Sequence, residues 1–214
     1  MREVILSGDA QAIYDCAFEA GRYLNQLRKI TFEQGGFFQA DLSIRPFEKQ
    51  EEYQPFVLDL LNDAIVQNSL GQQLHQSTTL WLQKHMALLP DKQESNLTHG
   101  DFDPANILVE NINGHWKITA ILDWEFAFAG TYFLDMGLFL RYAHKLPRCY
   151  EEGFISGIES EQFKLPPTWK VQAKLMDLLC LLNLLHYNPA EERPNLNRDV
   201  VGLIAKTTES HDEF

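Results

Sequence analysis

The sequence predicts a mainly helical α+β protein in which one β-hairpin carries a polar loop. Apolar residues recur at helical spacing on both sides of residues 97–124, whereas that stretch contains strand-like apolar runs around an Asn-Gly pair. No internal repeat and no linker-like composition divides the chain. We therefore expect one unit over residues 1–214, helical over 1–95 and 131–207, with the loop and hairpin at 96–125.

The chain begins with a short strand-like apolar run at residues 4–6, followed by a helix from about residue 10 to 29. Ser7 or Asp9 would cap this helix, because short polar side chains accept hydrogen bonds from the free N–H groups at a helix start. The apolar positions of the helix are spaced by four and three residues, which is the period of one helix face. This face is predicted to belong to the core.

Gly35-Gly36 interrupts the helical pattern and predicts a turn, which an irregular connection with one short strand would follow. Two more helices are expected at about 51–69 and 72–89, with Gly71 separating them. The helical segments expected after the hairpin are 134–146, a Gly-interrupted piece to about 160, 169–186 and 197–206.

The hairpin is predicted from two apolar runs, 107–109 and 116–122, that flank Asn113-Gly114. Asn-Gly is the typical pair of a type I′ turn, because both positions need a positive φ. The turn fixes the register of the two arms. Asn106 at the start of one arm and Asp123 at the end of the other should therefore fall at the same end of the ladder.

Three polar residues at this end, Asp101, Asn106 and Asp123, form the candidate site. Asp101 and Asn106 lie in a stretch that Gly100 and Pro104 keep from being regular helix. Phosphoryl transfer needs such a set: one carboxylate accepts the proton of the attacking hydroxyl, while a second carboxylate and an amide oxygen hold magnesium on the nucleotide phosphates. Asp101 is the predicted base, and Asn106 and Asp123 are the predicted ligands of Mg²⁺ and its nucleotide.

The spacing from His99 through Asp101 to Asn106 is that of the protein-kinase catalytic loop. Two departures stand out, since Gly100 replaces the arginine of that loop and Asp123-Trp124-Glu125 stands where those enzymes have Asp-Phe-Gly. The departures indicate another branch of the kinase-like folds.

Residues 99–108, which read His-Gly-Asp-Phe-Asp-Pro-Ala-Asn-Ile-Leu, are followed by Ile-Leu-Asp-Trp-Glu at 121–125 and Leu-Asp-Met-Gly at 134–137. Together they closely resemble the aminoglycoside phosphotransferase and choline kinase superfamily. The resemblance implies the larger, C-terminal lobe of the protein-kinase-like fold, with the hairpin carrying the active-site loop. It also suggests that Asp135 is a buried brace for the loop, where helix capping is the alternative.

By the same resemblance, the lobe would use ATP and Mg²⁺ to transfer the γ-phosphoryl group to a hydroxyl of a small molecule that is aminoglycoside-, choline- or sugar-like. The small N-terminal lobe that normally covers the nucleotide and supplies a lysine is not among the predicted elements. Only Lys29, Lys49, Lys84 and Lys92 precede the loop, and none lies in a run of apolar strands. We expect the chain to be part of a longer enzyme or a shortened homologue, and to lose activity when alone.

Two other functions remain open at this point. The first is a non-catalytic binding module that keeps the kinase-like scaffold, although such a module has no need to retain the base and both metal ligands. The second is a metal-dependent hydrolase using His99, Asp101, Asp103 and Asp123, which would require more histidines near the cluster than the sequence offers.

Composition limits the partners and the setting of the chain. The formal net charge is −12, which disfavours nucleic acid and would suit a cationic small substrate. Three cysteines without Cys-x-x-Cys spacing argue against a disulfide frame or a zinc site. No signal peptide and no apolar run long enough for a membrane span is present. A cytoplasmic location away from membranes is predicted.

Overall fold

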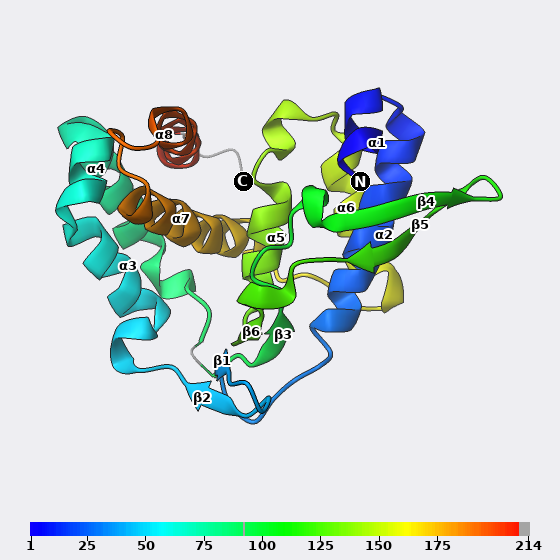
Figure 1. Cartoon of the computed structure of the whole chain (residues 1–214), viewed down its shortest axis with the longest axis horizontal. Coiled ribbons are helices and arrows are strands. Elements are labelled where there is room, and N and C mark those ends of the chain that lie inside the picture. The colour runs from blue at the N-terminus through cyan, green and yellow to red at the C-terminus, as the bar shows by residue number, and fades with distance from the viewer. Residues whose placement is uncertain (92, 210–214) are drawn as a thin grey trace. The chain divides into compact units, whose positions relative to one another are not determined.

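The computed structural model describes residues 1–91 and 93–209, and its contacts divide the chain into two compact units (Figure 1). The first unit combines Met1–Pro46 with Gln93–Pro167, and the second takes the described parts of Phe47–Lys92 and Thr168–Phe214. The predicted mainly helical α+β class is confirmed. The expectation that residues 1–214 form one lobe stays a prediction.

The first unit holds both sheets and four α-helices. Its α-helices are α1 (Arg2–Ser7), α2 (Ala10–Leu27), α5 (Tyr132–Leu140) and α6 (Cys149–Ile158). Its strands are β1 (Gly36–Phe38), β2 (Ile44–Pro46), β3 (Asn96–Thr98), β4 (Ile107–Ile112), β5 (His115–Ile121) and β6 (Phe128–Gly130). Its 3-10 turns are η3 (Pro104–Asn106), η4 (Trp124–Phe126), η5 (Ala143–Lys145) and η6 (Glu159–Glu161).

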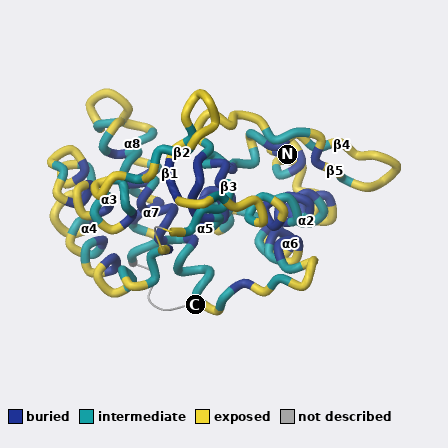
Figure 2. The backbone as a smooth tube through the Cα atoms, turned by 90° about the horizontal axis from the view of Figure 1, so that it is seen from below, coloured by how far each residue is buried: buried dark blue, intermediate teal, exposed yellow. Residues whose placement is uncertain are grey.

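Helices α2 and α6 pack at very short range, and buried positions gather on both (Figure 2). Gly153 and Gly157 of α6 face the backbone of α2, where a methyl group at Gly157 would overlap the carbonyl oxygen of Phe18. Gly21 of α2 meets the backbone of α6 in the same way. Glycine at these positions therefore sets the distance between the two helices.

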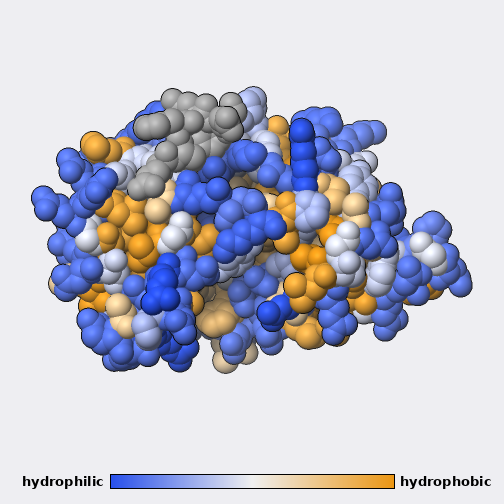
Figure 3. All heavy atoms as spheres, turned by 90° about the horizontal axis from the view of Figure 1, so that it is seen from above, coloured by the Kyte–Doolittle hydropathy of each residue, from blue (hydrophilic) through white to orange (hydrophobic). Residues whose placement is uncertain are grey.

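The larger sheet has the strand order β2-β1-β6-β3 and is antiparallel. Strands β4 and β5 form the predicted hairpin, with Ile107 opposite Ile121. Asn113 and Gly114 both have positive φ, at 55° and 85°, which confirms the type I′ turn. The hairpin tip, at the far right of Figure 1, is exposed in Figure 2 and mostly hydrophilic in Figure 3.

The second unit is helical. Its α-helices are α3 (Tyr53–Asn62), α4 (Ala64–His85), α7 (Trp169–Tyr187) and α8 (Pro194–Glu209), and its 3-10 turns are η1 (Lys49–Glu51) and η2 (Met86–Leu88). Helix α7 packs on the other three α-helices and buries a leucine-rich face that includes Leu178 and Leu182. Among the described residues, none of the helices combines the length and apolarity that crossing a membrane requires.

Two local predictions were wrong, and a third, at Gly71, was confirmed. Residues 4–6 lie in α1, a helix that Gly8 ends in a left-handed conformation and whose Val4 is buried. The helix expected at 51–69 is broken at Asp63, whose side chain accepts hydrogen bonds from the first N–H groups of α4. Gly71 separates two helical segments within α4, as predicted, because its φ of 67° and ψ of 168° are not helical.

Candidate active site

The loop that carries Asp101 is held at both of its ends. Strand β3 leads into the loop and pairs with β6, so that Thr98 lies opposite Phe128. Strand β4 leaves the loop and pairs with β5. Because β5 and β6 flank Asp123, these two pairings bring the loop and the segment around Asp123 together. The hydrogen bond from the Leu122 N–H to the Asn106 carbonyl oxygen, at 2.8 Å, continues the ladder to the site itself.

Asp101 and Asn106 are in direct contact. The side-chain amide of Asn106 donates to Asp101 Oδ2 at 2.8 Å and to the Asp101 carbonyl oxygen at 3.1 Å. Asp103 has a different task, because its carboxylate accepts from the Ala105 N–H and caps the turn η3. The contact leaves Asp101 Oδ1 and Asn106 Oδ1 without a hydrogen-bond donor among the described residues.

Asp123 is exposed and its backbone is left-handed, with φ 60° and ψ 57°. In the described part of the chain its carboxylate accepts no hydrogen bond. It follows Leu122, which pairs with Asn106, so Asn106 and Asp123 lie at the same end of the hairpin as the sequence predicted. The structure thus gathers all three candidate residues, while their chemical roles stay a prediction.

His99 joins the two halves of the site, although the sequence had suggested it only as a residue of the alternative hydrolase. It is fully buried, its Nδ1 accepts from the Asp101 N–H at 3.2 Å, and its Nε2 lies 2.9 Å from the Leu122 carbonyl oxygen. This arrangement requires the tautomer with hydrogen on Nε2. Burial lowers the pKa of His99, although the bond to Leu122 and the charges of Asp101 and Asp123 oppose that effect. A neutral imidazole therefore links the loop to the strand end.

Asp135 is the buried brace that the family resemblance suggested. Its carboxylate accepts from the His99 N–H at 2.8 Å and from the Gly100 N–H at 2.9 Å, while Thr131 caps α5 in its place. Burial raises the pKa of Asp135 to about 7, against the lowering effect of the two N–H donors. The brace fixes the backbone immediately before Asp101.

The structure explains why Gly100 stands where protein kinases have arginine. Its φ is 81°, which favours glycine, and a methyl group there would overlap the carbonyl oxygen of Phe126. The loop can thus pass directly against the backbone that follows Asp123. Any side chain at this position would separate the two segments.

The donor set suits a hard cation. Asp123 offers a free carboxylate and Asn106 a free amide oxygen, which are the oxygen ligands that Mg²⁺ prefers. A hydrolytic metal centre built on His99 is not supported, because hydrogen bonds occupy both ring nitrogens. Within residues 1–91 and 93–209, no three His, Cys, Asp or Glu side chains are grouped so that they could hold a metal ion.

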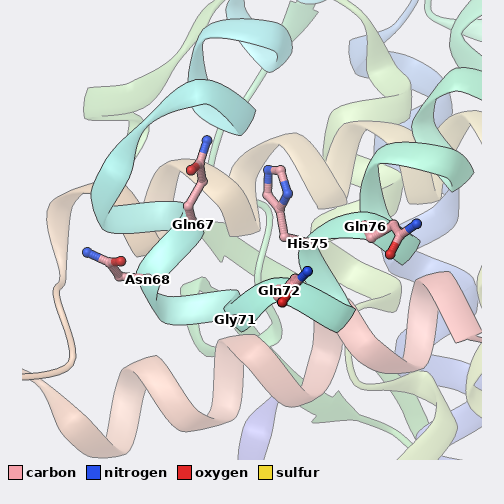
Figure 4. Close-up of a pocket in the computed structure, with 6 residues that line it drawn as sticks. All are labelled: Gln67, Asn68, Gly71, Gln72, His75 and Gln76. Carbon is pink, nitrogen blue, oxygen red and sulfur yellow. The ribbon is translucent and has the colours of Figure 1, made fainter.

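A hollow of about 640 Å³ lies along α4 in the second unit, around the kink at Gly71 (Figure 4). Its lining includes Gln67, Gln72 and His75 but none of the predicted site residues. The labelled side chains do not converge on one point in Figure 4, and His75 Nε2 is engaged with the Leu61 carbonyl oxygen. We therefore base the site on the loop and hairpin.

Several solved structures share this fold. A thermostable mutant of aminoglycoside phosphotransferase APH(4)-Ia, in ternary complex with AMP-PNP and hygromycin B, is 17% identical with a TM-score of 0.62, and the match covers 96% of this chain and 68% of that chain. Macrolide 2'-phosphotransferase MphH from Brachybacterium faecium is 21% identical with a TM-score of 0.59, and the match covers 94% of this chain and 61% of that chain. A choline/ethanolamine kinase family protein from Mesorhizobium loti is 15% identical with a TM-score of 0.60, and the match covers 99% of this chain and 65% of that chain.

At these identities the likeness establishes the fold, which is that of the kinase-like phosphotransferases. The chain spans between 61% and 68% of the length of these three proteins. The sequence profile of the phosphotransferase enzyme family matches residues 3–166, a span that contains the loop, the hairpin and Asp135. The chain therefore belongs to this family. No curated protein matches it.

Replacing Gly100 by alanine should destabilise the first unit more than the same change at Gly114. Both residues have positive φ, which costs an alanine about 1–2 kcal/mol, but only Gly100 faces the Phe126 carbonyl, whose overlap adds about 1–3 kcal/mol. Urea unfolding of the two variants measures the difference. Equal losses would show that the loop does not need the close approach.

The stability of the chain should depend on pH through Asp135. Since its pKa is raised from 3.8 to about 7, the folded chain keeps a proton there that the unfolded chain has lost. The stabilisation is complete below the unfolded pKa and disappears as pH rises through about 7, with a slope of at most about 1.4 kcal/mol per pH unit. Urea unfolding between pH 5 and 8 should show this slope in the wild type and not in Asp135→Asn. Parallel pH curves for the two proteins would contradict the assignment.

Proposed function

We propose that the chain is the lobe of an ATP-dependent small-molecule phosphotransferase that carries the base and the metal ligands. The proposal rests on one observation: Asn106 donates through its side chain to the Asp101 carboxylate and accepts through its backbone from Leu122, the residue directly before the exposed Asp123. Family membership supports the reaction type, and we assign a task to each of these three residues from their arrangement.

Asp101 acts as the general base in this proposal. Asn106 occupies its Oδ2, and its Oδ1 is free to accept the proton of the acceptor hydroxyl as that oxygen attacks phosphorus. His99 holds the Asp101 N–H, and Asp135 holds the two N–H groups before it. The base is thus fixed by its backbone, so that little reorganisation is needed when the acceptor arrives.

Asn106 Oδ1 and the Asp123 carboxylate would hold Mg²⁺ together with the phosphates of the nucleotide. When bound, the ion would neutralise charge on the phosphate oxygens. The amide of Asn106 serves both halves of the site, because its nitrogen donates to the base while its oxygen remains available to the metal. The exposure of Asp123 keeps its carboxylate accessible to the nucleotide.

The donor is proposed to be ATP and the acceptor a hydroxyl of an aminoglycoside-, choline- or sugar-like molecule. Two structures of the same fold were solved with AMP-PNP or ADP together with hygromycin B, which supports a nucleotide and a small acceptor. The net charge of −12 suits a cationic acceptor. We further propose that a nucleotide-covering lobe in a longer chain supplies the phosphate-binding lysine.

The 214-residue chain should bind Mg-ATP weakly, with Kd on the order of millimolar, because a few protein ligands and the phosphates carry the contact. Asp123→Ala should abolish this binding, whereas Asp101→Asn should retain it, since the base faces the acceptor. Calorimetric titration of the three proteins compares them. Micromolar binding with phosphoryl transfer by the chain alone would overturn the proposed need for a covering lobe.

In a form of the enzyme that turns over, Asp101→Asn should lower kcat by about 10²–10⁴-fold, the usual contribution of a general base, at unchanged nucleotide affinity. Asp103→Asn is the matched control, because that carboxylate caps a turn. A steady-state assay with a parallel nucleotide titration separates the effects. Equal loss of nucleotide binding in Asp101→Asn and Asp123→Ala would refute the assigned roles. Intact turnover in Asp101→Asn and in Asp123→Ala would favour a different site.

A further inference from the structure

The backbone of Asp123 needs support from its neighbours. A left-handed conformation is uncommon for residues other than glycine, and it persists where the surroundings fix it. The Asp123 carboxylate cannot provide that support, because it accepts no hydrogen bond within the described residues. The groups on either side of Asp123 must therefore hold it.

Leu122, the residue before Asp123, is fixed from two directions. Its N–H donates to the Asn106 carbonyl oxygen at 2.8 Å, and its carbonyl oxygen accepts from His99 Nε2 at 2.9 Å. These bonds orient the peptide that enters Asp123. They leave the peptide that follows Asp123 without a restraint from the loop.

Trp124, the residue after Asp123, provides the second restraint. Its indole N–H donates to the Ile121 carbonyl oxygen at 2.8 Å, which closes a ring of main chain and side chain around Leu122 and Asp123. Its ring packs on His99 with 4.5 Å between the ring centroids. Trp124 is still 39% exposed, so apolar burial alone does not account for a tryptophan here.

We propose that Trp124 is a positioning residue that holds Asp123 in the left-handed conformation in which its carboxylate meets Mg²⁺ and the nucleotide. The inference rests on the proposed role of Asp123 as a metal ligand. It explains why tryptophan stands where protein kinases have the phenylalanine of Asp-Phe-Gly. A phenylalanine at 124 retains a ring to pack on His99, whereas only the indole can donate to Ile121.

Trp124→Phe tests the indole hydrogen bond while keeping an aromatic ring. The matched control is Trp116→Phe on strand β5 of the same unit, where the indole donates to no residue in the described ranges. Mn²⁺–ATP serves as the probe, and its binding to the 214-residue chain is measured by the relaxation of water protons. Trp124→Phe should weaken binding by about three- to tenfold, the effect of one lost hydrogen bond, and Trp116→Phe should leave it unchanged.

A second readout does not need the metal. In NMR spectra of the wild type, the Trp124 indole N–H should exchange with solvent more slowly than that of Trp116, and Asp123 should show one backbone conformation with positive φ. Trp124→Phe should broaden or split the Asp123 amide signal while the melting temperature stays close to that of Trp116→Phe.

The outcomes separate the two proposals. A wild type that binds no Mn²⁺–ATP refutes the proposed metal site, and the NMR comparison then still decides whether Trp124 holds Asp123. If the wild type binds the probe but Trp124→Phe binds it equally well, or Trp116→Phe weakens it as much, the positioning role is wrong. An unchanged Asp123 signal in Trp124→Phe also overturns it.

Discussion

The candidate site depends on the buried carboxylate of Asp135. It accepts the N–H groups of His99 and Gly100, and from these two residues the loop reaches the opposite segment, through the His99 imidazole to Leu122 and through the bare Gly100 backbone to Phe126. Removing this acceptor would leave two N–H groups without a partner inside the protein, a cost of about 1–3 kcal/mol each. One carboxylate therefore defines both the path of the loop and its distance from Asp123.

The electrostatics of the site follow from what surrounds its two carboxylates. The charges of Asp101 and Asp123 raise the pKa of His99, but burial lowers it and keeps the imidazole neutral. In the described part of the chain, no Lys or Arg side chain bonds to either carboxylate. Carboxylates that lie near each other without a cationic partner favour the binding of a cation. The arrangement of the chain therefore leaves charge balance to a ligand, which agrees with the proposed use of a metal-nucleotide complex.

Local sequence signals predicted much of this arrangement. The Asn-Gly turn predicted the hairpin and the proximity of Asn106 and Asp123, and the residue types in the loop indicated the chemistry. The register shift between Leu108 and Val109 was not predicted. The left-handed backbone of Asp123, the tautomer of His99 and the indole bond of Trp124 were not predictable, because each depends on partners brought together by the fold. The same holds for Val4, where burial of a short segment outweighed its strand-like composition.

The glycine contacts between α2 and α6 also bear on how the chain reaches its native state. Helix α2 is synthesised well before α6, whose Gly153 and Gly157 supply the surface that fits it, and the sheet strands and part of the second unit are made in between. Pairing of such distant segments slows folding, because a long loop must close before the contact forms. During synthesis the apolar face of α2 therefore stays uncovered until α6 has been made, and such a surface is open to incorrect contacts for that time.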